Sequence, residues 1–240
     1  MLIGALEAGG SKMVCSIGNP EGGVLQRASF QTLTPDVTVP QIVDFIGKFD
    51  VKALGIGSFG PLDLNPASPT YGNIPKTPKK EWIDYPLMTT LKNALGVPTG
   101  IDTDVNAAAL AEYTMGAGKG RGSLLYVTVG TGIGGGIVID GKVLRGAHCF
   151  AGEFSFLRND VTTAANMGNS FAESGGWRAL RDAAVAEKGL PEGSPVDGRR
   201  VFEWIADGDK AAQRALDRYA RAFDGQLINL QAVLDPEVFV

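Results

Sequence analysis

Two glycine clusters and one carboxylate carry the chemistry that this sequence suggests. The clusters are EAGGSK (7–12) and VGTGIGGG (129–136), and each places a hydroxyl residue among its glycines. Glycine lacks a Cβ and tolerates positive φ, so its backbone N–H groups can approach an anion closely. A hydroxyl adds a donor, and a lysine adds charge opposite a phosphate. The clusters therefore predict a polyphosphate site made of Gly9, Gly10, Ser11 and Lys12 on one side and Gly130, Thr131 and Gly132 on the other.

Neither cluster follows an established phosphate-binding pattern. The spacing of the P-loop is absent, and the dinucleotide-binding fingerprint needs a helix directly after its glycines, where this chain has apolar, strand-like residues. A single glycine cluster is weak evidence for a ligand. Plain turns without any ligand therefore remain the alternative for each cluster.

The carboxylate lies in the stretch GIDTDVNAAALAE (100–112), where a strand is followed directly by a helix of small residues. Asp104 is expected to be the N-cap of this helix, which would keep it ionised. The carboxyl ends of strands are where α/β proteins place their ligands. An ionised aspartate there can accept the proton of a hydroxyl whose oxygen attacks phosphorus. Asp102 is a rival for this role, and a plain capping aspartate is the structural alternative.

Apolar periodicity predicts the elements that must position these groups. In the first half, a long loop rich in Pro, Gly and Lys (64–82) separates regular elements and is expected to bind a ligand. The expected elements are strands over 2–7, 13–18, 24–31, 51–59 and 97–103, helices over 40–49 and 85–96, and a helix that starts at 105 and ends near Gly116.

A second unit begins near residue 123 and repeats the opening pattern. An apolar strand, a glycine turn with a hydroxyl and another strand come in the same order, and Asp140-Gly141 then signals a hairpin. The likeness to the first unit is weak in sequence identity but consistent in architecture. Helices are expected over 171–187, 200–206 and 210–234, and LDPEVFV (234–240) starts a strand, so the chain is expected to be truncated.

The composition limits the classes of function. The 240 residues carry a formal net charge of −4, which argues against nucleic acid as a partner. No apolar run approaches the ~20 residues of a membrane span, and no basic-then-apolar leader opens the chain. Cys15, Cys149 and the single His148 lack the spacing of metal ligands. We expect a cytoplasmic protein that does not bind membranes.

Five motifs occur in an order that resembles the ROK-family sugar kinases. They are EAGGSK (7–12), GIGSFGPLD (55–63), TDVNAAALAE (103–112), GTGIGGG (130–136) and AGEF (151–154). Within the family the chain is most similar to bacterial fructokinases, because Glu7 replaces the commoner Asp and YGNIPKTPKKEW (71–82) resembles their loop. The resemblance implies an α/β, two-lobed actin-like ATPase (ribonuclease H-like) fold of the hexokinase/ROK type. Residues 1–115 would form the sugar and phosphate lobe, and residues 116–240 an incomplete nucleotide lobe.

The resemblance also implies an activity and a role for each site residue. The chain would phosphorylate a hexose with ATP and Mg²⁺, converting D-fructose to fructose 6-phosphate, and would form a homodimer. Asp104 would be the general base. The sugar pocket would include Gly60, Thr103, Asn106 and Glu153. Glu7 would act on the magnesium side through water, while the two glycine clusters would hold the phosphates of ATP and Gly175 would lie near the nucleotide.

Departures from the family pattern leave the substrate open. The histidine that many members carry three residues after the glutamate is replaced by Phe156. The segment 158–177 contains no Cys or His, so no structural zinc is predicted. Mannose, glucose or a β-glucoside are therefore alternative substrates, and a catalytically weak sugar-binding remnant is another reading. A sugar-responsive repressor of this family would need a DNA-binding domain ahead of the first motif, for which residues 1–6 leave no room.

Overall fold

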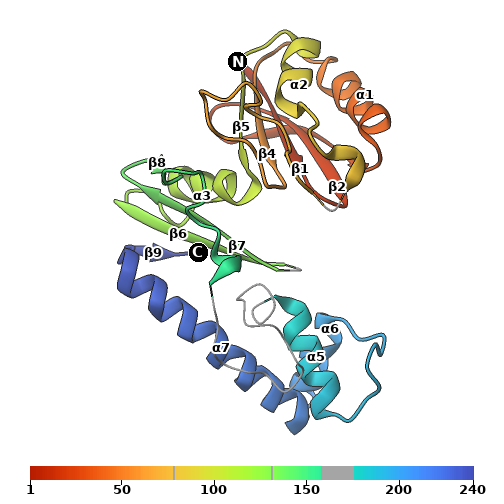
Figure 1. The fold of residues 1–240 in the computed structure, drawn as a ribbon, viewed down its shortest axis with the longest axis vertical. Coiled ribbons are helices and arrows are strands. Elements are labelled where there is room, and N and C mark those ends of the chain that lie inside the picture. The colour runs from red at the N-terminus through yellow and green to blue at the C-terminus, as the bar shows by residue number, and fades with distance from the viewer. Residues whose placement is uncertain (78, 131, 158–175) are drawn as a thin grey trace.

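The computed structural model describes residues 1–77, 79–130, 132–157 and 176–240. It contains a five-stranded sheet with two helices on one face, a four-stranded sheet, and a group of three helices at the opposite end of the molecule from the first sheet (Figure 1). None of the helices within the described ranges is long and apolar enough to cross a membrane.

The first sheet has the strand order β3-β2-β1-β4-β5. Its strand β1 alternates buried and exposed residues, with Leu6 and Ala8 in the core and Ala5 and Glu7 on the other face. The antiparallel strands β2 and β3 continue from β1, while β4 and β5 run parallel to it. The strands are β1 (Leu2–Ala8), β2 (Lys12–Gly18), β3 (Val24–Gln31), β4 (Val51–Ser58) and β5 (Thr99–Thr103).

Helices α1 (Pro35–Ile46) and α2 (Leu87–Leu95) cover one face of this sheet (Figure 1). Ile42 and Leu91 from the helices are fully buried in one apolar cluster with side chains of β1, β2 and β4. The prediction that α1 begins at residue 40 was wrong. The helix begins at Pro35, since proline suits the first position of a helix, where its missing N–H costs nothing, and Pro40 lies inside the helix.

The loop between β4 and α2 is ordered around Trp82. The indole of Trp82 is completely buried, and its Nε1–H donates to the carbonyl of Leu33 at 2.8 Å. Its ring meets those of Phe59 and Tyr85 edge-on, with centroids 6.1 and 5.3 Å away. The short helix η1 (Lys80–Trp82) brings the tryptophan into this position.

The second sheet has the order β8-β7-β6-β9, which repeats the β3-β2-β1-β4 order of the first sheet. In both sheets a hairpin comes first and a later strand joins its first strand in parallel. Asp140 and Gly141 both have positive φ in the β7–β8 turn, as an Asp-Gly hairpin requires. The strands are β6 (Ser123–Val129), β7 (Ile133–Ile139), β8 (Lys142–Val143) and β9 (Val238–Phe239).

Helix α3 (Asp104–Met115) packs between the sheets on positions that lack side chains. A methyl group at Gly57 of β4 would lie 3.0 Å from Cβ of Ala107. A methyl group at Gly136 of β7 would lie 2.6 Å from Cβ of Ala109, and one at Gly134 would lie 2.9 Å from Val105. Gly134 and Gly136 of β7 therefore serve the close approach of α3 and not a turn.

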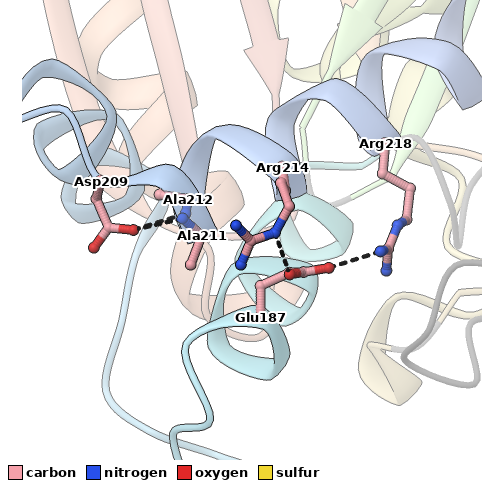
Figure 2. A network of polar contacts seen from close by, with 6 residues as sticks. All are labelled: Glu187, Asp209, Ala211, Ala212, Arg214 and Arg218. Carbon is pink, nitrogen blue, oxygen red and sulfur yellow. Dashed lines mark hydrogen bonds and ion pairs between the residues drawn. The ribbon is translucent and has the colours of Figure 1, made fainter.

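Helices α5 (Trp177–Glu187), α6 (Gly198–Ala206) and α7 (Lys210–Leu234) pack on one another. Figure 2 shows that the carboxylate of Glu187 accepts from Arg214 at 3.0 Å and from Arg218 at 2.6 Å. Hydrogen bonds from Arg214 lower the pKa of Glu187 below its ordinary value. Asp209 caps α7 by accepting from the backbone N–H groups of Ala211 and Ala212 (Figure 2). The predicted segment 171–175 lies outside the described residues.

Replacing Gly136 with alanine should destabilise the fold. The new methyl group would overlap Ala109 and the Val105 carbonyl, so the free energy of unfolding should fall by about 1–3 kcal/mol. Gly100→Ala is the matched control, because no atom lies within 4 Å of its added methyl group. Denaturant unfolding of both variants checks this. An equal loss in both would show that α3 does not depend on the close approach.

Candidate functional site

The three parallel strands of the first sheet end at the same level. Ala8 of β1 pairs with Ser58 of β4, and Ser58 pairs with Thr103 of β5. The segments that follow these residues therefore leave from one edge of the sheet. This register brings the first glycine turn, Gly60 and Asp104 to that edge, and for Asp104 the sequence predicted a position at the carboxyl end of a strand.

The turn between β1 and β2 contains the first glycine cluster. The N–H of Gly9 donates to the carbonyl of Lys12 at 3.0 Å. Gly10, Ser11 and Lys12 are exposed, so a ligand can reach them. Behind the turn, the buried Thr32 donates its hydroxyl to the Gly9 carbonyl at 2.7 Å and its N–H to the Ser11 carbonyl at 3.0 Å.

The turn between β6 and β7 is built in a similar way. The N–H of Gly130 donates to the carbonyl of Gly132 at 2.9 Å. The Gly130 carbonyl accepts from the N–H of Trp177, the first residue of α5. The predicted contributions of Thr131 and Gly175 lie outside the described residues.

Asp104 is the first residue of α3, and the prediction that it is the N-cap was wrong. The N-cap is Thr103, whose backbone is still extended and whose Oγ1 accepts from the N–H of Asn106 at 3.2 Å. This arrangement leaves the Asp104 carboxylate at the start of the helix, where Oδ1 accepts from the N–H of Val105 at 2.9 Å. Threonine is itself a favoured N-cap residue, so the sequence already offered Thr103 for this position.

The surroundings of Asp104 favour its protonated form more than expected. Displacement of water by the protein raises the pKa of Asp104, and the negative charge of Glu7 raises it further, although the N–H groups of Val105 and of Asp104 itself oppose this. A position at the helix N-terminus alone predicts an ionised carboxylate. A raised pKa brings a carboxylate closer to the proton affinity that a general base needs near neutral pH.

Asp102 is held by three donors among the described residues. Its Oδ1 accepts from the N–H of Thr103 at 2.8 Å and from Nδ2 of Asn106 at 2.7 Å. Its Oδ2 pairs with the guanidinium of Arg145, which comes from the loop after β8. Asp102 thus joins the first sheet, α3 and the loop after β8, and its oxygens are less available than those of Asp104 to a substrate proton.

Glu153 lies near Asp104 because the residues on either side of it pack against β7. A methyl group at Gly152 would lie 2.6 Å from the carbonyl of Gly135, and one at Gly135 would lie 2.1 Å from the ring of Phe154. Glu153 precedes the short helix η2 (Phe154–Phe156) and is half-buried. Burial raises the pKa of Glu153, and the negative charge of Asp104 adds to it, so the two carboxylates lie within electrostatic reach.

A cleft of about 1020 Å³ lies between the open face of the first sheet and α3. Its charged and amide side chains are those of Glu7, Asp102, Asp104, Asn106 and Arg145. Glu7 and Asp102 flank Gly57 in the strand register, which keeps the space between them free of a side chain. Of the described residues, those of the two glycine turns do not line this cleft, so a polyphosphate site across both turns stays a prediction.

The carboxylates of the cleft could bind Mg²⁺ only together with oxygen atoms of a bound ligand. Within the described ranges, no three His, Cys, Asp or Glu side chains come together in a way that could bind a metal ion. Mg²⁺ in phosphoryl-transfer sites keeps several waters and takes one or two carboxylates together with substrate phosphates. Glu7 on the cleft wall is suited to that role.

Sequence reasoning missed two residues of this region. Thr32 follows β3 and supports the first glycine turn across 23 residues of chain. Arg145 reaches Asp102 from 43 residues away. No local pattern marks either residue, because both act through contacts that exist only once the strands have paired.

Comparison with known proteins supports the motif analysis. A fructokinase from Pediococcus pentosaceus is 42% identical over 146 residues, which are 61% of this chain and 51% of that protein. A ROK hexokinase structure from Thermus thermophilus matches with a TM-score of 0.79 and 29% identity, covering 100% of this chain and 80% of that one. A ROK-family glucokinase from Streptomyces griseus, solved with glucose and AMPPNP, matches with a TM-score of 0.76 and 28% identity over 100% and 82%.

These likenesses confirm the predicted fold of the hexokinase/ROK type. The chain spans about half the length of the curated fructokinases that it matches. The model of the ROK family itself matches residues 3–240. The protein belongs to the ROK family.

Proposed function

We propose that the protein is an ATP-dependent sugar kinase that transfers the γ-phosphoryl group to a hexose, with Asp104 as the general base. The observation that carries the proposal is the position of Asp104. It lies in the cleft, at the sheet edge that also bears the first glycine turn, and its pKa is raised. Glu153 lies within electrostatic reach of it and supplies acceptors for sugar hydroxyls.

In this reaction the sugar oxygen forms the new bond to the γ-phosphorus while the bond from that phosphorus to the β,γ-bridging oxygen breaks. The hydroxyl proton passes to the Asp104 carboxylate. Glu153 and the groups around Thr103 orient the sugar, and the exposed N–H groups of the glycine turn face the phosphates. Bound Mg²⁺ neutralises phosphate charge, and Glu7 would hold it through water.

D-Fructose is the sugar we propose, giving fructose 6-phosphate. Support comes from the relatives named fructokinase, such as the Pediococcus pentosaceus protein at 42% identity. Glucose is the second candidate, because the Streptomyces griseus glucokinase, solved with glucose, matches along the whole chain.

A sugar panel tests the proposal. ADP release from ATP should be measured with fructose, glucose, mannose and a β-glucoside, and fructose should give the highest kcat/KM. Glucose in first place would move the assignment to the second candidate. Sugar binding in calorimetry without turnover of any sugar would overturn the kinase proposal in favour of a sugar-binding protein.

Asp104→Asn should reduce kcat by about 10²–10⁴-fold, the usual contribution of a general base, while sugar affinity in calorimetry stays close to that of the unmodified protein. Asp44→Asn, on the exposed side of α1, is the control and should keep full activity. Asp102→Asn should lose less activity than Asp104→Asn. The reverse order would transfer the role of base to Asp102.

The pH profile should reflect the raised pKa of Asp104. A general base must be ionised, so kcat/KM should fall as pH decreases through this pKa, and the fall should begin at a higher pH than for an ordinary aspartate. Glu7→Gln removes a negative charge that raises this pKa, so the acidic midpoint should move to lower pH even where the rate itself drops. Glu21→Gln, in the exposed β2–β3 turn, is the control. An unmoved midpoint in Glu7→Gln would contradict the assignment.

A further inference from the structure

We propose that Thr32 is a positioning residue that holds the Gly9–Lys12 turn in the conformation that receives the nucleotide phosphates. The proposal rests on the kinase function for the identity of the ligand, but the contacts that carry it stand on their own. Thr32 is 4% exposed and lies in the segment between β3 and α1.

The turn is fixed by its carbonyl groups. The Gly9 carbonyl accepts the hydroxyl of Thr32 at 2.7 Å, and the Ser11 carbonyl accepts the N–H of Thr32 at 3.0 Å. The carbonyl of Lys12 accepts from Gly9 within the turn. Partners inside the protein thus engage the carbonyl oxygens of Gly9, Ser11 and Lys12, whose partial negative charge would repel a phosphate.

The donors of the turn are left for a ligand. Among the described residues, no acceptor engages the backbone N–H groups of Gly10 and Ser11, and both residues are exposed. Successive N–H groups that point outward from a turn form a concave anion site. By engaging the carbonyls on one side, Thr32 selects the turn orientation in which the N–H groups face outward.

Thr32 can hold the turn because hydrogen bonds from other segments fix the backbone of Thr32 and Leu33. Its carbonyl accepts from Nζ of Lys79 at 3.3 Å. The next residue, Leu33, accepts from the indole of the fully buried Trp82 at 2.8 Å and donates its N–H to Thr38 at 3.0 Å.

Phe59 connects Trp82 to the residue before the glycine turn. Its ring packs against Trp82, and its N–H donates to the carbonyl of Ala8, directly before the turn, at 2.8 Å. The glycine turn is therefore held on one side by Thr32 and on the other by Phe59, and Trp82 links the segments of these two residues. Removing the Thr32 hydroxyl deletes one of these contacts and leaves the backbone hydrogen bonds in place.

Thr32→Val tests this role, because it removes the hydroxyl and keeps a branched side chain of similar shape. The hydrogen bond lost is worth about three- to tenfold in affinity, so KM for ATP should rise by that factor while KM for the sugar changes less than twofold. Thr32→Ser, which restores the hydroxyl, should return KM for ATP to within twofold of the original. Thr99→Val is the matched control. The Thr99 hydroxyl also donates to a backbone carbonyl, that of Val97 at 3.0 Å, but Thr99 is the first residue of β5 and lies at the opposite edge of the sheet from the site.

Amide hydrogen exchange provides a readout that does not depend on activity. The peptide covering residues 8–13 should exchange faster in Thr32→Val than in Thr32→Ser or Thr99→Val. Thr32→Ala makes the same comparison if the valine variant does not fold. Unchanged exchange together with an unchanged KM for ATP, in a protein that phosphorylates sugar, would overturn the role of Thr32 and leave the kinase proposal intact. Faster exchange in a protein that phosphorylates no sugar would support the role of Thr32 and overturn the kinase proposal.

Discussion

The site depends on the parallel register of three strands. Because Ala8 of β1 and Thr103 of β5 both pair with Ser58 of β4, the chain leaves the sheet at one level in all three places. Side-chain direction alternates along a strand, so a shift of one residue would turn Glu7 and Asp102 from the cleft into the core. The register of these strands thus determines which carboxylates face the cleft and which segments leave the sheet at its edge.

Helix α3 connects the first sheet to the second. It begins directly after β5, and it approaches both sheets at glycines, at Gly57 on one side and at Gly134 and Gly136 on the other. The Asp102–Arg145 pair ties the base of the helix to the loop after β8. Among the described residues, close contact at these glycines and the Asp102–Arg145 ion pair link the two sheets through α3.

The sequence predicted what local patterns determine. Alternation located the strands of both sheets, Asp-Gly located the β7–β8 hairpin, and the order of five motifs indicated the family, which the family match over residues 3–240 confirmed. The start of α1 was misplaced because the spacing of apolar residues predicted a helix only from residue 40, whereas the helix begins at Pro35. The N-cap was assigned to Asp104 because both Thr103 and Asp104 are good capping residues and only the backbone geometry separates them. Thr32 and Arg145 could not be found, since pairing across tens of residues creates their contacts.

The place of Asp104 at the junction of β5 and α3 gives it a property that neither sheet alone would confer. Its proton affinity is set mainly by how much water the surrounding protein displaces, and that protein includes elements packed on both sheets. The proton affinity of this carboxylate therefore depends on how completely the elements on the two sheets enclose it, and opening either side to water would return its pKa toward that of an ordinary aspartate.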